Sequence, residues 1–218
     1  MHTACYEIAA IASVRLRALL RSKRFHSTAS LVRQYKSQIL SSIDFTTPAV
    51  YHAPLFFLKV IDKLQDDFLE ELSLSPLVAL CDYNLAPLCT RRDISMMGLL
   101  HRVTLGDAPV QFRSFIYPAK PGAQNRGWAY TFERHGKQLH DPIDGTASRM
   151  MERSVLGLIY SYNALPAQVV KYTSTKTFQC CLQKGVRACA RAGSPNWQTH
   201  LKLGARAHGI TFFRKFFE

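Results

Sequence analysis

Apolar side chains recur at the spacing of α-helices in the first 75 residues. Residues 4–21 are predicted to form one helix, and a second is predicted from just after Thr28 to about Ile43, with Pro48 as its stop. The apolar face of the first helix is formed by Ile8, Ile11, Ala12, Leu16, Leu19 and Leu20. That of the second is formed by Leu31, Val32, Tyr35, Ile39 and Ile43. Because each face needs a partner, residues 4–44 are expected to form a packed helical pair.

Two further helices are predicted in the middle of the chain. Pro54 suits the first turn of a helix whose apolar and acidic positions are separated. The apolar positions are Ile61, Leu64, Phe68 and Leu72, and the acidic positions are Asp62, Asp66, Asp67 and Glu70. Thr90 and Asp93 have the spacing of a capping box, which predicts that a very apolar helix starts there. This helix should run to Leu105 and end at Gly106.

Proline and glycine interrupt the helical pattern between residues 107 and 148. Within this stretch, residues 128–132 (Trp-Ala-Tyr-Thr-Phe) and 137–139 (Lys-Gln-Leu) flank His135-Gly136, which predicts a short β-hairpin. Helices return over Ser148–Tyr162 and about Thr175–Ala192, and Gly193 is expected to end the last one. The predicted fold class is therefore mainly α, with a small β-hairpin insertion.

Charge is distributed unevenly along the chain, which has 28 Lys and Arg against 15 Asp and Glu, a net charge of +13. Residues 1–50 hold seven basic and two acidic residues, residues 51–90 hold two and six, and residues 91–218 hold nineteen and seven. This excess favours an anionic partner, most commonly nucleic acid, although many organellar proteins are basic without a polyanion site. No apolar run approaches the roughly 18 residues of a membrane span, so no membrane partner is expected.

Residues that could support catalysis are sparse. Asp66 and Asp67 are adjacent, as are the metal-binding aspartates of reverse transcriptases, but the helical spacing around them directs neighbouring side chains about 100° apart. An acidic helix face is therefore the preferred interpretation. His101 is interpreted as a hydrogen-bonded core histidine, and none of the six cysteines lies in a Cys-X-X-Cys pair. No catalytic residue, metal site or cofactor is expected. Reduced thiols suggest an intracellular protein. The sequence leaves the compartment open and favours nucleus or cytoplasm over mitochondrion.

Basic residues near the N-terminus form the first candidate site. Arg17, Arg21 and Arg24 would share one face if the first helix extends that far, and Lys23 adjoins them. Such a face could follow a phosphate backbone, or it could simply be solvated. The Ser/Thr-rich residues 25–30 follow these arginines, a combination typical of a mitochondrial presequence. The alternative function is thus a basic structural protein of mitochondria or another organelle, with a cleavable N-terminal presequence.

Five short motifs occur in an order that resembles the region after the catalytic palm in non-LTR (LINE-type) reverse transcriptases. The first two are residues 16–21 (Leu-Arg-Ala-Leu-Leu-Arg) and 31–37 (Leu-Val-Arg-Gln-Tyr-Lys-Ser), the latter with Pro48 and Tyr51, and they are similar to the thumb helices. The third is Gln65-Asp66-Asp67-Phe68-Leu69, similar to a Gln-x-x-Phe-Leu helix. The fourth combines residues 84–88 (Asn-Leu-Ala-Pro-Leu), Arg91-Arg92 and Leu99-Leu100-His101. The last combines Arg153-Ser154, Tyr162-Asn163-Ala164-Leu165-Pro166, Ser174 and Phe178, with Tyr162 in place of the usual Trp.

The resemblance covers about residues 10–200 and implies the family's role, target-primed copying of element RNA into DNA, in which this region grips template and product. The palm aspartates and the endonuclease are absent, so neither activity is implied. The predicted division is a thumb-like helical region (1–75), a connecting helix region (76–106), a loop with the hairpin (107–147), a C-terminal helical region (148–203) and a basic-aromatic tail (204–218). Expected partners are RNA or an RNA–DNA hybrid and, as a further candidate, a polymerase palm domain encoded elsewhere. The expected contacts are Arg17, Arg21, Lys23 and Arg24, followed by Arg91 and Arg92.

Overall fold

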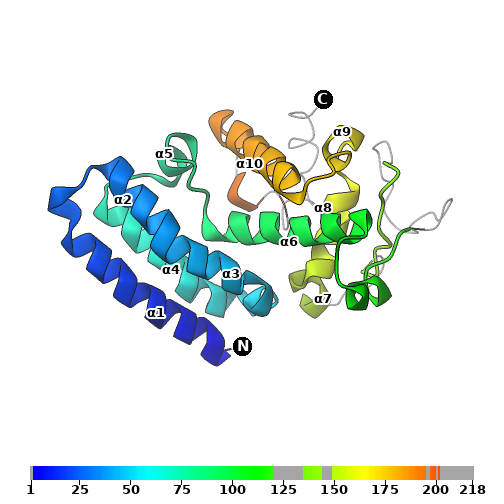
Figure 1. Ribbon diagram of the computed structural model, residues 1–218, viewed down its shortest axis with the longest axis horizontal. Coiled ribbons are helices and arrows are strands. Elements are labelled where there is room, and N and C mark those ends of the chain that lie inside the picture. The colour runs from blue at the N-terminus through cyan, green and yellow to red at the C-terminus, as the bar shows by residue number, and fades with distance from the viewer. Residues whose placement is uncertain (1, 120–134, 144–148, 195–196, 200, 202–218) are drawn as a thin grey trace. The chain divides into compact units, whose positions relative to one another are not determined.

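The computed structural model of the chain describes residues 2–119, 135–143, 149–194, 197–199 and 201 (Figure 1). These residues are mainly helical, which confirms the predicted α class. The chain divides into two compact units, Met1–Arg92, which we call unit 1, and Asp93–Glu218, which we call unit 2. The division falls inside one helix, α6, which spans Leu88–Leu105.

Unit 1 contains two long helices, α1 (His2–Arg21) and α4 (Leu55–Glu71), which lie side by side (Figure 1). An unbroken helical stretch between them in sequence comprises α2 (Thr28–Tyr35), the π-helical turn η2 (Lys36–Leu40) and α3 (Ser41–Val50). The 3-10 helix η1 (Lys23–Phe25) precedes this stretch, and α5 (Pro76–Cys81) follows α4. Because α1 packs against α2, η2 and α3, the predicted pairing of the first two helices is confirmed, with α4 as a further partner of α1.

The core of unit 1 follows the helical stripes. Buried on α1 are Cys5, Ala9, Ala12, Leu16 and Leu19. This face is rotated from the predicted one, because Ile8 and Leu20 are only partly buried and Ile11 is 56 % exposed. Tyr35 of α2 and Phe68 of α4 are both fully buried and stack with 4.2 Å between their ring centroids. The stacked rings fix the position of α2 along α4.

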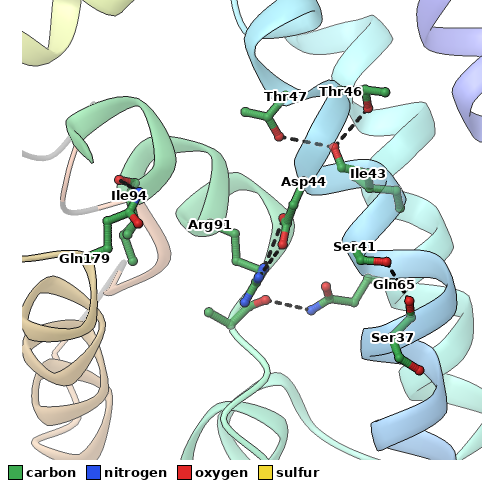
Figure 2. A network of polar contacts seen from close by, with 11 residues as sticks. Ser37, Ser41, Ile43, Asp44, Thr46, Thr47, Gln65, Arg91, Ile94 and Gln179 are labelled. Atoms are coloured by element: carbon green, nitrogen blue, oxygen red, sulfur yellow. Dashed lines mark hydrogen bonds and ion pairs between the residues drawn. The ribbon is translucent and has the colours of Figure 1, made fainter. Parts of the chain in front are cut away.

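Pro48 does not end the second helix, contrary to the prediction, because α3 continues through it to Val50. Thr47 and Val50, on either side of the proline, are both almost fully buried. Their packing outweighs the unfavourable effect of proline on a helix. The hydroxyls of Thr46 and Thr47 also donate to the backbone oxygen of Ile43 (Figure 2).

The start of α6 differs from the prediction, while its end agrees. α6 begins at Leu88, so Thr90 and Asp93 lie inside the helix and the predicted capping box is wrong. Helical hydrogen bonding begins one residue earlier, at Pro87, because the N–H of Arg91 donates to the backbone oxygen of Pro87. Proline suits a helix start, since the backbone N–H that it lacks would have no partner there. At the end, Gly106 has a φ of +84°, which favours glycine after the last helical turn.

The described part of unit 2 after α6 is made of short helices and one long one. They are η3 (Val110–Ser114), α7 (Arg149–Arg153), η4 (Val155–Leu158), α8 (Ile159–Asn163), α9 (Ala167–Val170), α10 (Thr175–Arg191) and η5 (Trp197–Thr199). The predicted last helix is confirmed as α10, and Gly193 follows it with a φ of +69°.

The single helix predicted over residues 148–162 is instead broken into α7, η4 and α8. Ser154 has an extended backbone, and its hydroxyl donates to the backbone oxygen of Met151 and accepts from the N–H of Leu156. It thereby closes α7 and opens η4. The chain turns so tightly here that a Cβ at Gly157 would collide with the backbone oxygen of Glu152.

The predicted β-hairpin is not supported. Its first strand, residues 128–132, lies outside the described residues, as does the tail over 204–218. Leu139, from the predicted second strand, forms an isolated antiparallel bridge with Pro118 instead. No longer strand occurs in the part of the chain that the structure describes.

Candidate nucleic-acid interface

Four of the six predicted binding residues lie where α1 ends and η1 follows. Arg17 and Arg21 are exposed on α1, one helical turn apart. Beyond Arg21 the α-helix stops, and the Ser22 hydroxyl donates to the backbone oxygen of Leu19 at 2.7 Å, which satisfies a carbonyl at the helix end. Arg24 therefore belongs to η1 and does not continue the face of Arg17 and Arg21. The prediction that three arginines share one α-helical face is wrong.

These four exposed residues, Arg17, Arg21, Lys23 and Arg24, which we call the basic end of α1, differ in their partners. Lys23 donates to the backbone oxygen of Glu71 and forms an ion pair with its carboxylate at 3.1 Å. Both side chains of that pair are half exposed, so solvent screens it. The Arg24 guanidinium lies 4.8 Å from the centroid of the Phe25 ring. Within the described residues no carboxylate pairs with Arg17, Arg21 or Arg24, so three positive charges face solvent.

Arg91 and Arg92, the other two predicted residues, lie in the first turns of α6. Arg91 forms a two-point ion pair with Asp44 of α3, with 3.3 Å between Nε and Oδ1 (Figure 2). Arg92 forms another with Asp62 of α4, at 2.6 and 2.9 Å, and is only 5 % exposed. Two-point pairing is the strong geometry between arginine and carboxylate. The structure thus brings four predicted residues together and holds the other two in ion pairs within unit 1.

Gln65 of α4 makes a further link to the segment before α6. Its Nε2 donates to the backbone oxygen of Ala86 at 3.1 Å, and its side chain is almost fully buried (Figure 2). The next two residues, Asp66 and Asp67, are exposed on a helix, as predicted. Partial desolvation, followed by the charges of Asp62 and Asp67, raises the pKa of Asp66. Adjacent helical side chains diverge, so this pair cannot hold metal ions as a polymerase palm does.

His101 of α6 is completely buried in unit 2. Its Nε2 lies 2.8 Å from the backbone oxygen of Tyr172, and its Nδ1 lies 3.0 Å from the Tyr162 hydroxyl. Because a carbonyl can only accept, Nε2 carries the proton and Nδ1 accepts from Tyr162. The imidazole also stacks on Phe178 of α10, with 4.1 Å between centroids. Burial lowers the pKa of His101, so the predicted core histidine is confirmed in its neutral form.

A second buried histidine and an asparagine hold residues 135–139 against α8. The Nε2 of His135 donates to the backbone oxygen of Tyr162 at 3.1 Å, and its Nδ1 accepts from the backbone N–H of Lys137. Asn163 holds both backbone groups of Leu139, donating to the oxygen at 2.7 Å and accepting from the N–H at 2.8 Å. Burial also lowers the pKa of His135. These contacts therefore use uncharged groups.

A second group of exposed basic residues lies on α10 and was not among the predicted site residues. Lys176, Lys184 and Arg191 are exposed, and α10 contains no acidic residue. The signal in the sequence is their spacing of eight and seven residues, each close to two helical turns. The apolar stripe of the same helix, which predicts its fold, does not reveal this second pattern.

Other features that could indicate function within the described residues are metal ligands, cysteines and membrane-spanning helices. No group of three or more His, Cys, Asp or Glu side chains there could hold a metal ion. The six cysteines are free thiols, and burial raises the pKa of Cys189 to about 11. No helix in this part of the chain has both the length and the apolar character needed to cross a membrane.

Comparisons with protein-family models, with curated proteins and with solved structures give no match to this chain. The family resemblance therefore depends on the motif residues themselves and on where they lie.

Proposed function

We propose that this chain is a nucleic-acid-binding module of reverse-transcriptase descent, corresponding to the thumb and post-palm region of a non-LTR element. The observation that carries the proposal is that residues of different motifs, far apart in the sequence, contact one another inside the units. Motif residues inherited from one ancestral fold are expected to meet in this way.

In unit 1, three motifs form one connected set of contacts. Tyr35, from the Leu-x-x-x-Tyr-x-Ser motif, stacks on Phe68, from the Gln-x-x-Phe-Leu motif. Gln65, of the same Gln-x-x-Phe-Leu motif, donates to the backbone oxygen of Ala86, in the segment that leads into α6. Arg92, which follows in the same motif as Ala86, pairs with Asp62 on the helix that carries Gln65.

In unit 2, the fourth and fifth motifs meet at His101. The fifth motif supplies two of its side-chain neighbours, Tyr162 through a hydrogen bond and Phe178 through ring stacking. Tyr162 stands where the family usually has Trp. An indole N–H is a donor, as the tyrosine hydroxyl is, so either residue can supply the hydrogen bond that His101 Nδ1 accepts. The departure from the motif therefore keeps a hydrogen-bond donor at this position.

The proposed ligand is RNA or an RNA–DNA hybrid, contacted through its phosphates at the basic end of α1. Arg17, Arg21 and Arg24 present guanidinium groups to solvent, and guanidinium geometry suits phosphate oxygens. Phosphate contacts carry little base preference, so binding should be nearly indifferent to sequence. Arg91 and Arg92, by contrast, would act by holding α6 in place and not by touching the ligand.

The proposal assigns no polymerase activity to the chain alone. Asp66 and Asp67 diverge on an exposed helix, so a palm domain encoded elsewhere would have to supply the catalytic aspartates. A primer-extension assay with magnesium or manganese is expected to give no templated product. Templated product above a blank would contradict this part of the proposal.

The packing of α1 argues against a cleavable presequence. Cleavage near residues 27–30 would remove Leu16 and Leu19, which are buried in unit 1. Burial of each side chain contributes roughly 1.5–3 kcal/mol, and its loss would expose the helix faces that it covers. α1 therefore fits an integral part of the fold better than a leader.

The test is fluorescence anisotropy with a labelled RNA–DNA hybrid over a salt series. The parent protein is expected to bind with a log–log salt slope of about −3, from three to four phosphate contacts. Arg17→Glu/Arg21→Glu should weaken binding about tenfold at low salt and reduce the slope by about 2. Lys59→Glu/Lys63→Glu is the matched control, because Lys59 and Lys63 are also exposed one turn apart on a unit 1 helix.

The two outcomes are distinct once circular dichroism has shown that both variants are folded. A loss of affinity for the hybrid that is confined to Arg17→Glu/Arg21→Glu supports a localised site at the basic end of α1. Equal losses in both variants would mean that only net charge matters and would reject that site. A parent protein that binds no hybrid at low salt would reject the proposed function.

A further inference from the structure

The outer face of α10 carries its basic residues in one stripe. At about 100° per residue, Lys176, Lys184, Arg187 and Arg191 fall within an arc of about 80°. Lys176, Lys184 and Arg191 are exposed and Arg187 is half-buried. The rise of about 1.5 Å per residue spreads the stripe over about 22 Å, which is long enough to face several consecutive phosphates of one strand.

The opposite face of α10 is the one that packs into unit 2. It is formed by Phe178, Leu182, Gly185, Val186, Cys189 and Ala190. Phe178 stacks on His101, and Gln179 donates to the backbone oxygen of Ile94 at 3.5 Å (Figure 2). These contacts fix the rotation of α10, so the basic stripe must face outward. Among the described residues, no ion pair involves Lys176, Lys184 or Arg191.

An exposed aromatic side chain precedes α10. Tyr172 is 39 % exposed, and its backbone oxygen accepts a hydrogen bond from His101 Nε2 at 2.8 Å. The backbone that carries the ring is therefore anchored to buried His101, while part of the residue faces solvent. An exposed aromatic ring close in sequence to a basic helix face is the combination that binds single-stranded nucleic acids, because bases stack on the ring while phosphates contact the cations. An acidic protein would use the cations but would not need the ring.

We infer that the outer face of α10, with Tyr172, is a second nucleic-acid contact that binds a single strand through its phosphates and one stacked base. The inference rests on the proposed function and adds a site in unit 2 to the one at the basic end of α1. Sequence composition agrees with this placement. Residues 93–218 hold seventeen basic and seven acidic residues, whereas residues 1–92 hold eleven and eight.

The experiment measures binding of the full chain to labelled oligouridine RNA by anisotropy over a salt series, with heparin as a polyanion without bases. Lys184→Glu/Arg191→Glu should weaken RNA binding about tenfold at low salt and reduce the salt slope by about 1.4, the value for two single-strand contacts. Tyr172→Leu should weaken RNA binding about fivefold or more and leave heparin binding unchanged. Tyr172→Phe, which keeps the ring, should bind RNA like the parent. Lys59→Glu/Lys63→Glu is the charge-matched control.

The outcomes separate this inference from the proposed function. If Arg17→Glu/Arg21→Glu weakens binding while Lys184→Glu/Arg191→Glu resembles the control, the α10 contact is rejected and the proposed function stands. The inference is overturned if Tyr172→Leu binds RNA as tightly as the parent and Lys184→Glu/Arg191→Glu loses affinity for RNA and heparin equally. In that case α10 is a general polyanion surface. If the parent binds neither hybrid nor oligouridine, both proposals fail.

Discussion

In unit 1, two arginines are held in two-point ion pairs with carboxylates from other helices, whereas in unit 2 three buried neutral side chains join segments that are far apart in the sequence. Arg91 and Arg92 join the start of α6 to α3 and α4. In unit 2, His101, Tyr162 and Asn163 serve the same purpose with neutral hydrogen bonds. Ion pairs therefore add to the apolar core in unit 1, and neutral hydrogen bonds add to it in unit 2.

The difference teaches how basic residues should be interpreted. Arg92 and Arg17 are equally basic in the sequence, but a carboxylate placed by the fold neutralises the first, and the second faces solvent. A paired arginine is expected to matter for stability, and a solvent-facing one for binding. Each prediction below tests one side of this contrast.

The largest effect is expected at Arg92. Arg92→Ala leaves the Asp62 carboxylate without its partner, and removing one member of a buried pair is strongly destabilising. We expect a loss of about 3 kcal/mol in the free energy of unfolding, near the low end for such pairs because the Asp62 side chain is 26 % exposed. Urea unfolding followed by circular dichroism measures it.

Two controls sharpen the Arg92 result. Arg92→Met/Asp62→Leu removes both charges and should recover most of the lost stability, since the unpaired carboxylate is then absent. Arg33→Ala, at an exposed position on α2, should change stability by less than about 0.5 kcal/mol. If Arg92→Ala is as mild as Arg33→Ala, the ion pair does not support the fold and the contrast between the arginines fails.

A somewhat smaller effect is expected at Asn163, which is the uncharged counterpart in unit 2. Asn163→Ala leaves the buried N–H and carbonyl of Leu139 without partners, and each unpaired group costs about 1–3 kcal/mol. Partial relaxation should bring the total to about 2 kcal/mol. Gln138→Ala removes only one long bond of 3.4 Å to the backbone oxygen of Asn163 and serves as the control. Equal melting temperatures for the two variants would rule out the proposed role of Asn163.

The smallest effect is a dependence of stability on pH that originates in unit 2. Burial lowers the pKa of His101 and of His135 below the unfolded value of about 6.5. As pH falls, the unfolded state therefore binds protons first. The contribution of the two neutral histidines to the free energy of unfolding is complete above about pH 6.5. It is lost as pH falls through their lowered pKa values in the folded state. Melting temperatures measured from pH 7.5 to 5 should decline below pH 6.5, and His135→Asn should decline less steeply. A melting temperature that rises on acidification contradicts neutral buried histidines.

Periodicity predicted the parts of the fold in which one helix face packs locally. α4 and α10 follow their apolar stripes, α1 does so only in part, and Gly106 and Gly193 end helices as expected, because stripe and stop are encoded within a few turns. The break at Ser154 could not be predicted in this way. Its residues keep helical spacing, and the side-chain bonds of Ser154 and the close approach at Gly157 decide the backbone instead.

The candidate site was predictable only in part, because pairing depends on residues far away in the sequence. Arg91 and Arg92 were singled out for their charge, but their partners Asp44 and Asp62 lie on other helices. Arg24 was placed on the face of Arg17 by extending α1 beyond the point at which it stops. Sequence spacing identifies which residues could share a face, and only the fold determines which charges remain exposed.

The most direct test of the account is chemical footprinting of the arginines with phenylglyoxal, read by mass spectrometry with and without saturating RNA–DNA hybrid. Arg17, Arg21 and Arg24 face solvent, so they should react in the free protein and be protected by the hybrid. Arg92, buried against Asp62, should react little in either state. Equal reactivity of Arg17 and Arg21 with and without saturating hybrid would contradict the account. So would an Arg92 that reacts in the free protein and is protected by the hybrid.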